Sequence, residues 1–219
     1  MRSVWIVVIV LLGANLSFAQ TADYYFKAGS NDVRLGNLDS ASSNFTKAIE
    51  LRTNNPEAYF ARGNVEFDKG RFDAALSDYN KTIELKPDFG TAYCNRASAR
   101  GAKGDLNGAL ADCNKAIKLE PGSYMAYDIR GNVKDQKGDR TGAISDYSKA
   151  IKLNSSYAIA YYNRGVSRSY TGDSKGALSD YNKAISLWQK AAPQNPTQEQ
   201  QLQTWLKKAE RAKEYMTVY

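Results

Sequence analysis

Histidine is absent from this 219-residue sequence, and only two cysteines are present. Without histidine, Ser-His-Asp and Cys-His catalysis, histidine general bases and histidine metal ligands are all excluded. An enzyme built from this sequence would have to work with carboxylates, lysine, tyrosine or cysteine alone. Asp128 and Asp135 share one face of a predicted helix, but two carboxylates on one helix are a common feature of solvated faces. We therefore expect no catalytic residues, no metal and no cofactor.

Long apolar runs are absent except near the N-terminus, where residues 4–12 form an unbroken apolar stretch. Arg2 precedes this stretch, and Ser17 and Ala19 place small residues before a cut at Gln20. This pattern predicts a cleavable signal peptide over residues 1–19. The alternative is a retained anchor, but the run is too short to span a bilayer comfortably. No cysteine follows the run, so we expect no lipid-modified N-terminus.

The ending Phe18-Ala19-Gln20 resembles signal peptides of Gram-negative bacteria, which places the mature protein in the periplasm or outside the cell. The formal charge of +7 falls to +6 when Arg2 leaves with the signal. The basic residues are spread evenly along the chain, and an exported protein rarely meets nucleic acid, so we expect no nucleic-acid partner. We expect membrane contact only through a partner or an uncleaved signal, although a mild attraction to acidic polymers or lipid headgroups stays open.

Tyrosine recurs every 34 residues along most of the chain, and other residue types recur in phase with it. The tyrosines are Tyr25, Tyr59, Tyr93, Tyr127 and Tyr161. A small residue follows each one at Gly29, Gly63, Ala97, Gly131 and Gly165. A glycine comes next at Gly36, Gly70, Gly104, Gly138 and Gly172, and then an alanine at Ala41, Ala75, Ala109, Ala143 and Ala177. Five copies in phase indicate a repeat protein.

Each copy predicts two antiparallel helices. The recurrent glycine ends the first helix, because glycine takes the left-handed C′ conformation without penalty. The small residue before it and the alanine after it face each other, so the two helix axes can approach closely. An aromatic residue lies one turn beyond the alanine, on the same face. These aromatic residues are Phe45, Tyr79, Tyr147 and Tyr181.

These rows resemble the tetratricopeptide repeat (TPR), whose pattern is an aromatic, a small residue, an alanine, an aromatic, another alanine and a closing proline. The resemblance implies an all-α fold, an α-solenoid of five helix-turn-helix repeats. We expect the repeats over residues 22–55, 56–89, 90–123, 124–157 and 158–191. Departures are few: Thr82 replaces an alanine, and Thr53, Ser155 and Gln189 replace the closing proline.

The last segment predicts a capping helix over residues 197–216, after Pro193 and Pro196. Thr197 and Gln200 are spaced as a capping box. One apolar face follows at helical spacing, made of Leu202, Trp205, Leu206 and Ala209. A solenoid must cover the open face of its last repeat, and this helix suits that role.

An arginine and an aspartate recur at positions that face each other in an antiparallel hairpin. The pairs are Arg62 with Asp78, Arg96 with Asp112, Arg130 with Asp146, and Arg164 with Asp180. The first repeat lacks both members, with Ala28 and Asn44 in their places. Joint loss is what a buried ion pair predicts, because one charge left buried alone costs roughly 3–5 kcal/mol. We therefore interpret the pairs as structural.

Cys94 and Cys113 lie roughly level across the hairpin of the third repeat. An oxidising compartment would allow a disulfide between them. TPRs of cytosolic proteins carry cysteine at these places as small core residues, and level positions do not ensure that the two Cβ atoms converge. Both interpretations stay open.

In the TPR family the first helices of successive repeats line a concave groove. The resemblance implies peptide contacts from the following residues: Phe26, Phe60, Asn64, Phe67, Asp128, Asn132, Asp135, Tyr162 and Val166. The third repeat offers Cys94, Ser98 and Gly101, which are small and leave room. The lysines of the clamp that binds acidic chaperone tails are missing, because this sequence has Phe26, Phe60, Cys94, Asp128 and Tyr162 there.

A lysine also recurs once per repeat on the second helix, at Lys47, Lys81, Lys115, Lys149 and Lys183, and predicts a solvated convex stripe. Together the patterns favour a non-catalytic module that binds a peptide or protein segment in the groove of an exported TPR array. The alternative is an architectural subunit of a bacterial envelope complex, assembled through its convex face or termini. The partner's identity does not follow from the fold.

Overall fold

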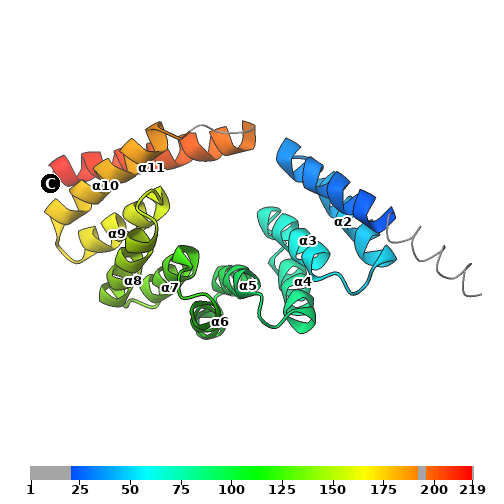
Figure 1. Cartoon of the computed structure of the whole chain (residues 1–219). Helices are drawn as coiled ribbons and strands as arrows, with labels where there is room; N and C mark the ends of the chain where they lie inside the picture. The colour runs from blue at the N-terminus through cyan, green and yellow to red at the C-terminus, as the bar shows by residue number, and fades with distance from the viewer. Residues whose placement is uncertain (1–20, 192–195, 219) are drawn as a thin grey trace, which may run out of the picture. The chain divides into compact units, whose positions relative to one another are not determined.

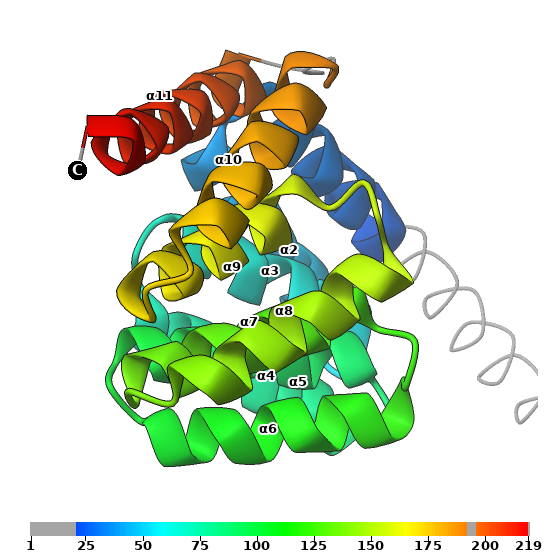
Figure 2. The ribbon, with the colours of Figure 1, turned by 90° about the vertical axis from the view of Figure 1, so that its left-hand side faces the viewer.

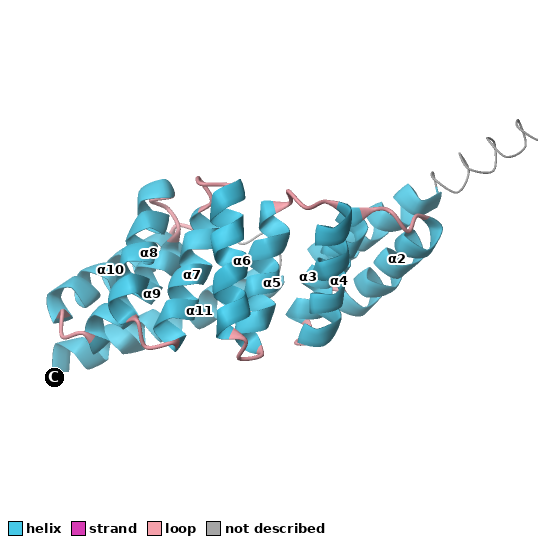
Figure 3. Ribbon diagram, turned by 90° about the horizontal axis from the view of Figure 1, so that it is seen from below, coloured by secondary structure: helices cyan, strands magenta, loops and turns pink. Residues whose placement is uncertain are grey.

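The computed structural model describes residues 21–191 and 196–218, and the predicted signal peptide lies outside them. The chain divides into two compact units, Met1–Pro87 and Asp88–Tyr219. The described residues form helices and connecting turns with no strand (Figure 3). The all-α prediction is confirmed.

Unit 1 holds the first two predicted repeats (Figure 1, blue to cyan). A helix over residues 21–35 is followed by α2 (Leu38–Leu51), α3 (Pro56–Asp68) and α4 (Phe72–Leu85). Helix α2 packs against α3, and α3 packs against α4. Asn55 caps α3 by accepting a hydrogen bond from the Ala58 backbone N–H, and Pro56 occupies the first turn, where no intrahelical donor is lost.

Unit 2 holds the other three predicted repeats and the last helix. Its helices are α5 (Gly90–Ala102), α6 (Leu106–Leu119), α7 (Tyr124–Gln136), α8 (Arg140–Leu153), α9 (Ala158–Tyr170), α10 (Ser174–Gln189) and α11 (Pro196–Val218). The first helices α5, α7 and α9 contact one another in turn, whereas the second helices α6, α8 and α10 do not, within the described residues. The first helices therefore lie on the inner, concave side of unit 2.

Glycine ends the first helix of every hairpin, as predicted. Gly36, Gly70, Gly104, Gly138 and Gly172 all have φ between 73° and 85°. Other residues pay a steric cost in this left-handed region, so these positions favour glycine. In unit 2 the second helices start at aspartate caps, and Asp105, Asp139 and Asp173 each accept a hydrogen bond from a backbone N–H three residues on.

The small residue of each first helix is matched to the residue that faces it. A Cβ added at Gly131 would lie 2.6 Å from Tyr147 Cε1, and one at Gly165 would lie 2.8 Å from Tyr181 Cε1. In the third repeat Ala97 replaces the glycine and Cys113 replaces the aromatic, and both are buried in one core cluster. Volume lost on one helix is thus restored on the other, which keeps the hairpin close-packed.

The predicted arginine–aspartate pairs are in contact in all four hairpins that carry them. Each arginine donates two hydrogen bonds to its aspartate, Nε at 2.9 Å and a terminal nitrogen at 2.7 Å. Three of the arginines also donate to the second helix of the preceding hairpin: Arg62 to Thr46, Arg130 to Asn114, and Arg164 to Ser148. The bridge therefore fixes both the hairpin and its stacking.

The three paired aspartates of unit 2 each contact a second cation, which was not predicted from the sequence. Arg100, Lys134 and Arg168 lie one turn after the first arginine and contact Asp112, Asp146 and Asp180 at 2.7–2.8 Å. In unit 1 the corresponding residue is an acid, Glu66, which accepts a hydrogen bond from Ser42. In the sequence, a basic residue recurs four positions after the first arginine of each pair in unit 2, and this recurrence could have indicated the second contact.

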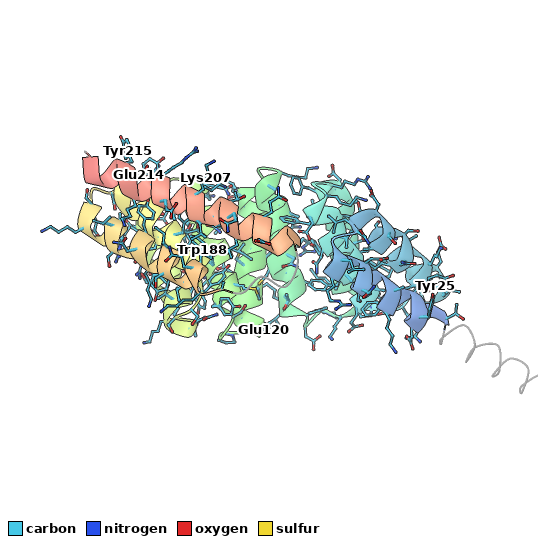
Figure 4. The ribbon with its side chains drawn as sticks, turned by 90° about the horizontal axis from the view of Figure 1, so that it is seen from above. Tyr25, Glu120, Trp188, Lys207, Glu214 and Tyr215 are labelled. Carbon is cyan, nitrogen blue, oxygen red and sulfur yellow. The ribbon has the colours of Figure 1, made fainter. Side chains whose placement is uncertain are left out.

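Helix α11 packs along α10 (Figure 2) and begins at Pro196, one residue before the predicted start. Ala209 is buried, and the other three residues of its predicted apolar face pack on the cluster that contains Ala184 and Trp188. The exposed Lys207, Glu214 and Tyr215 lie along the edge of α11 away from α10 (Figure 4). The side chain of Thr197, half of the predicted capping box, lies outside the described side chains.

We expect Gly131→Ala to lower the free energy of unfolding by about 1–3 kcal/mol, because the new methyl group has no space beside the Tyr147 ring. Chemical denaturation followed by helical circular dichroism measures this change. Tyr147→Cys copies the natural pairing of Ala97 with Cys113, so adding Gly131→Ala to Tyr147→Cys should cost less than adding it to the wild type. An equal cost of Gly131→Ala in both backgrounds would contradict the proposed volume match.

Candidate functional site

A cavity of about 470 Å³ opens on the concave side of unit 2, between α5, α7 and α9. Its lining residues are Ala97, Ser98, Gly101, Ala102, Ile129, Asn132, Val133, Asp135, Gln136, Tyr147, Tyr162, Asn163 and Val166. Four of the predicted groove residues line it: Asn132, Asp135, Tyr162 and Val166.

The cavity exists because α5 contributes small residues. Ala97, Ser98, Gly101 and Ala102 form its α5 wall, and a Cβ added at Gly101 would meet only Val133, at 3.9 Å. Ser98 and Gly101 therefore leave room here, in agreement with the sequence prediction. Cys94, predicted beside them, is buried and does not line the cavity.

One charged side chain, Asp135, lies among the lining residues. It is half-buried and accepts a hydrogen bond from the Ser167 hydroxyl at 2.9 Å. Asn132 accepts a hydrogen bond from the Tyr147 hydroxyl at 2.8 Å, which orients its amide. No lysine or arginine lines the cavity, so its electrostatic field favours a cation over an anion.

Asp128 does not face the groove, and its predicted placement there is corrected. Its side chain is 3 % exposed and lies behind the cavity wall. It accepts hydrogen bonds from Asn163 Nδ2 at 3.1 Å, Asn132 Nδ2 at 3.3 Å and the Tyr157 hydroxyl at 3.4 Å. Burial raises the pKa of this carboxyl to about 6, against the three hydrogen bonds that lower it. Helical periodicity cannot reveal this, because Asn163 lies on α9 of the next repeat and Tyr157 is the residue that immediately precedes α9.

Tyr162 lines the cavity and also contacts the last helix. Besides lining the cavity, its ring lies 5.4 Å from the Trp205 ring on α11 and 6.0 Å from the Trp188 ring on α10. The two tryptophans stack at 5.7 Å, and Trp188 lies beside the α11 ribbon in Figure 4. Helix α11 therefore supports one end of the cavity as well as covering the last repeat.

The predicted groove residues of unit 1 are half-buried and pack against their own hairpins. The Phe26 ring lies 5.5 Å from the Phe45 ring, and the Phe60 ring lies 6.0 Å from the Tyr79 ring. Phe67 packs edge-on against Phe72, and Asn64 accepts a hydrogen bond from the Tyr79 hydroxyl. Their role in peptide binding stays a prediction.

Both cysteines are buried free thiols in the structure, which favours the small-core interpretation over the disulfide. Burial raises the pKa of Cys94 to about 11 and that of Cys113 to about 12. Since the thiolate is the reactive form, neither residue is suited to nucleophilic chemistry.

No group of three or more acidic or cysteine side chains is arranged to hold a metal ion within the described residues. In the same residues, every helix is too short or too polar to cross a bilayer.

We expect Asp128→Asn to remove the cost of ionising the buried carboxyl. The Asn amide nitrogen cannot accept the hydrogen bonds that both carboxylate oxygens accept, so the change should appear in the pH dependence of unfolding and not as a net gain at pH 7. The folded-state pKa is raised, so the native protein loses stability as pH rises from about 4 to about 6, and this loss should vanish in the variant. Denaturation at pH 5 and pH 7 measures the loss in both proteins. Parallel pH profiles would contradict the assigned burial cost.

The thiols should resist a thiol-reactive chromogen such as DTNB in the native protein and react fully after denaturation without reductant. Burial and the high thiol pKa values both predict this protection. If denaturation without reductant released no thiol, whereas reduction did, the two cysteines would be disulfide-bonded and the small-core interpretation would be wrong.

Comparisons with known proteins agree with this geometry. The family description "TPR repeat" matches residues 63–104 and 131–168, and "Tetratricopeptide repeat" matches residues 22–55, 90–123 and 158–187. No curated protein matches the chain.

Solved structures share the fold. The crystal structure of MamA is 25% identical with a TM-score of 0.63, covering 78% of this chain and 93% of that chain. TTC0263, a thermophilic TPR protein of Thermus thermophilus, is 20% identical with a TM-score of 0.71, covering 84% and 98%. The first TPR of Spaghetti (RPAP3), bound to the HSP90 peptide SRMEEVD, is 26% identical with a TM-score of 0.54, covering 55% and 95%. With the repeat matched in sequence and the helical hairpins stacked in space, the chain belongs to the tetratricopeptide repeat family.

Proposed function

We propose that this protein is a non-catalytic interaction module that binds a peptide or protein segment in the concave cavity of unit 2. The cavity itself is the observation that carries the proposal. Its α5 wall is kept small at Ser98 and Gly101, and at Gly101 the fold would accept a larger side chain. A TPR array is held together by neighbouring repeats, so such positions are free to specify a partner.

The lining indicates the chemistry of the ligand. Ile129, Val133 and Val166 offer an apolar surface, and Asp135 supplies the negative charge. The RPAP3 repeat binds an acidic peptide, SRMEEVD, whereas no cation lines this cavity. We therefore infer a segment with an apolar anchor and a basic side chain that pairs with Asp135.

Several features argue against catalysis. The ionisable side chains of the cavity are Asp135, Tyr147 and Tyr162, and burial raises the pKa of both tyrosines. A tyrosine with a raised pKa is a poor base at neutral pH, and no nucleophile lies beside a base here. We also propose that the protein binds its partner after export to the periplasm or beyond, which rests on the pattern of residues 1–19.

The test begins with in-cell crosslinking and mass spectrometry to identify the partner and its bound segment. The variant Gly101→Leu fills the cavity from a helix that tolerates the new side chain. We expect it to weaken binding of that segment at least tenfold, about 1.4 kcal/mol, without loss of helix content. Gly101→Ala is the matched control and should bind almost as well as the wild type.

A second comparison separates groove binding from the architectural alternative. If Gly101→Leu binds normally while removal of Lys115, Lys149 and Lys183 abolishes capture, the partner uses the convex side and the proposal is wrong. Asp135→Asn should weaken binding and reduce its dependence on salt, because it removes the charge of the cavity.

A further inference from the structure

The outer helices of unit 2 carry exposed lysines in adjacent rows. Besides Lys175 near the start of α10, these are Lys115 and Lys118 on α6, Lys149 and Lys152 on α8, and Lys183 on α10, and these last five are all exposed. We call these five residues the lysine stripe. Although basic residues are spread evenly along the sequence, the fold gathers these on the side of unit 2 opposite the cavity.

No exposed acid offsets the lysine stripe within α6, α8 and α10. Each helix has one acidic residue, Asp112, Asp146 or Asp180, and each is buried and bound to two cations. These carboxylates therefore neutralise the arginine and lysine side chains of the first helices, and not the exposed lysines. Within these three helices the exposed lysines have no exposed acid beside them, and the nearest acids, such as Glu120, lie at the helix ends.

The fold itself does not require this arrangement. In unit 1, Glu50 and Glu84 occupy the repeat positions of Lys118 and Lys152. Glu84 forms an ion pair with Lys81 at 2.6 Å, so the second helix of this hairpin is locally neutralised. Two helices of the same protein thus tolerate glutamate where unit 2 has lysine.

Part of the lysine stripe is fixed in position. Lys149 lies over the Tyr127 ring at 5.8 Å, and Lys115 lies over the Tyr93 ring at 6.0 Å. These contacts hold ammonium groups at regular places on successive hairpins. A repeating row of cations matches an extended anionic surface better than a single anionic group.

We propose that the lysine stripe binds the surface of an anionic phospholipid membrane. Lysine is depleted at protein interfaces, which rely on an apolar centre, and Leu153 is the one exposed large apolar residue described on these outer helices. Lysine acts as a strongly hydrated point charge, which suits diffuse attraction to headgroups. This contact differs from the expectation that the protein reaches membranes only through a partner or its signal.

The test measures partitioning onto vesicles by co-sedimentation. The chain from Gln20 onward is used, since every contact described lies within residues 21–218 and the apolar leader would itself insert. The protein should bind vesicles of mixed phosphatidylglycerol and phosphatidylcholine, and far less to phosphatidylcholine alone. Binding should disappear at about 1 M salt, where the Debye length is about 3 Å.

The diagnostic variant is Lys118→Glu/Lys152→Glu, which copies the glutamates of unit 1. Each lysine near an anionic surface contributes about five-fold, so we expect partitioning to fall at least ~25-fold. The matched control, Lys27→Glu/Lys207→Glu, makes the same change in net charge at exposed positions outside the stripe and should retain most of the binding. Helix content and thermal unfolding confirm that both variants fold.

Two results would overturn the proposal. Equal loss in the diagnostic and control variants would show that net charge alone drives binding. Binding to a soluble acidic protein such as prothymosin, with no partitioning onto anionic vesicles, would assign the stripe to an acidic protein partner instead. Neither result bears on the cavity, which lies on the other side of unit 2.

Discussion

The close approach of two helices at one small residue in each hairpin is the constraint on which the rest of this structure depends. Gly131 and Gly165 leave no space for a methyl group because an aromatic ring fills the gap from the facing helix. Since interiors pack at near-crystalline density, the ring and the glycine must be chosen together. The third repeat shows the same rule with a different pair, Ala97 and Cys113.

The arginine–aspartate ion pairs lie between these closely packed helices. Each arginine reaches its own aspartate and, in three hairpins, a polar side chain of the hairpin before it. Burying a charge is costly unless it is paired and hydrogen-bonded, and here both conditions are met. One interaction therefore sets the geometry within a repeat and the register between repeats. It also withdraws the aspartates from the surface, and the outer helices of unit 2 remain basic as a result.

A solenoid is stabilised by contacts between neighbouring repeats. The residues on its inner and outer surfaces can therefore differ in size and charge without loss of the fold. The inner surface of unit 2 is small and weakly acidic around Gly101 and Asp135, while its outer surface is basic. Asp128 belongs to neither the inner nor the outer surface, because its side chain is buried. It is a buried carboxyl that accepts hydrogen bonds from neutral donors, Asn163 on α9 and Tyr157 just before α9 among them, and burial raises its pKa.

The sequence by itself determined the helices, the turns, the repeat and the paired residues, because all of these recur at a fixed spacing. Glycine at the turns, Arg130 facing Asp146 and the apolar face of α11 follow from local periodicity. Tertiary structure decided what depends on contacts between repeats. It buried Asp128, which the family resemblance placed in the groove, because Asn163 on α9 and Tyr157 just before α9 donate hydrogen bonds to it. It also brought Tyr162 to Trp205 on α11, whereas the exposed row of Lys115, Lys149 and Lys183 on the second helices already followed from the repeat spacing. Spacing along a chain reports which face of its own helix a residue occupies, but not which neighbour covers that face.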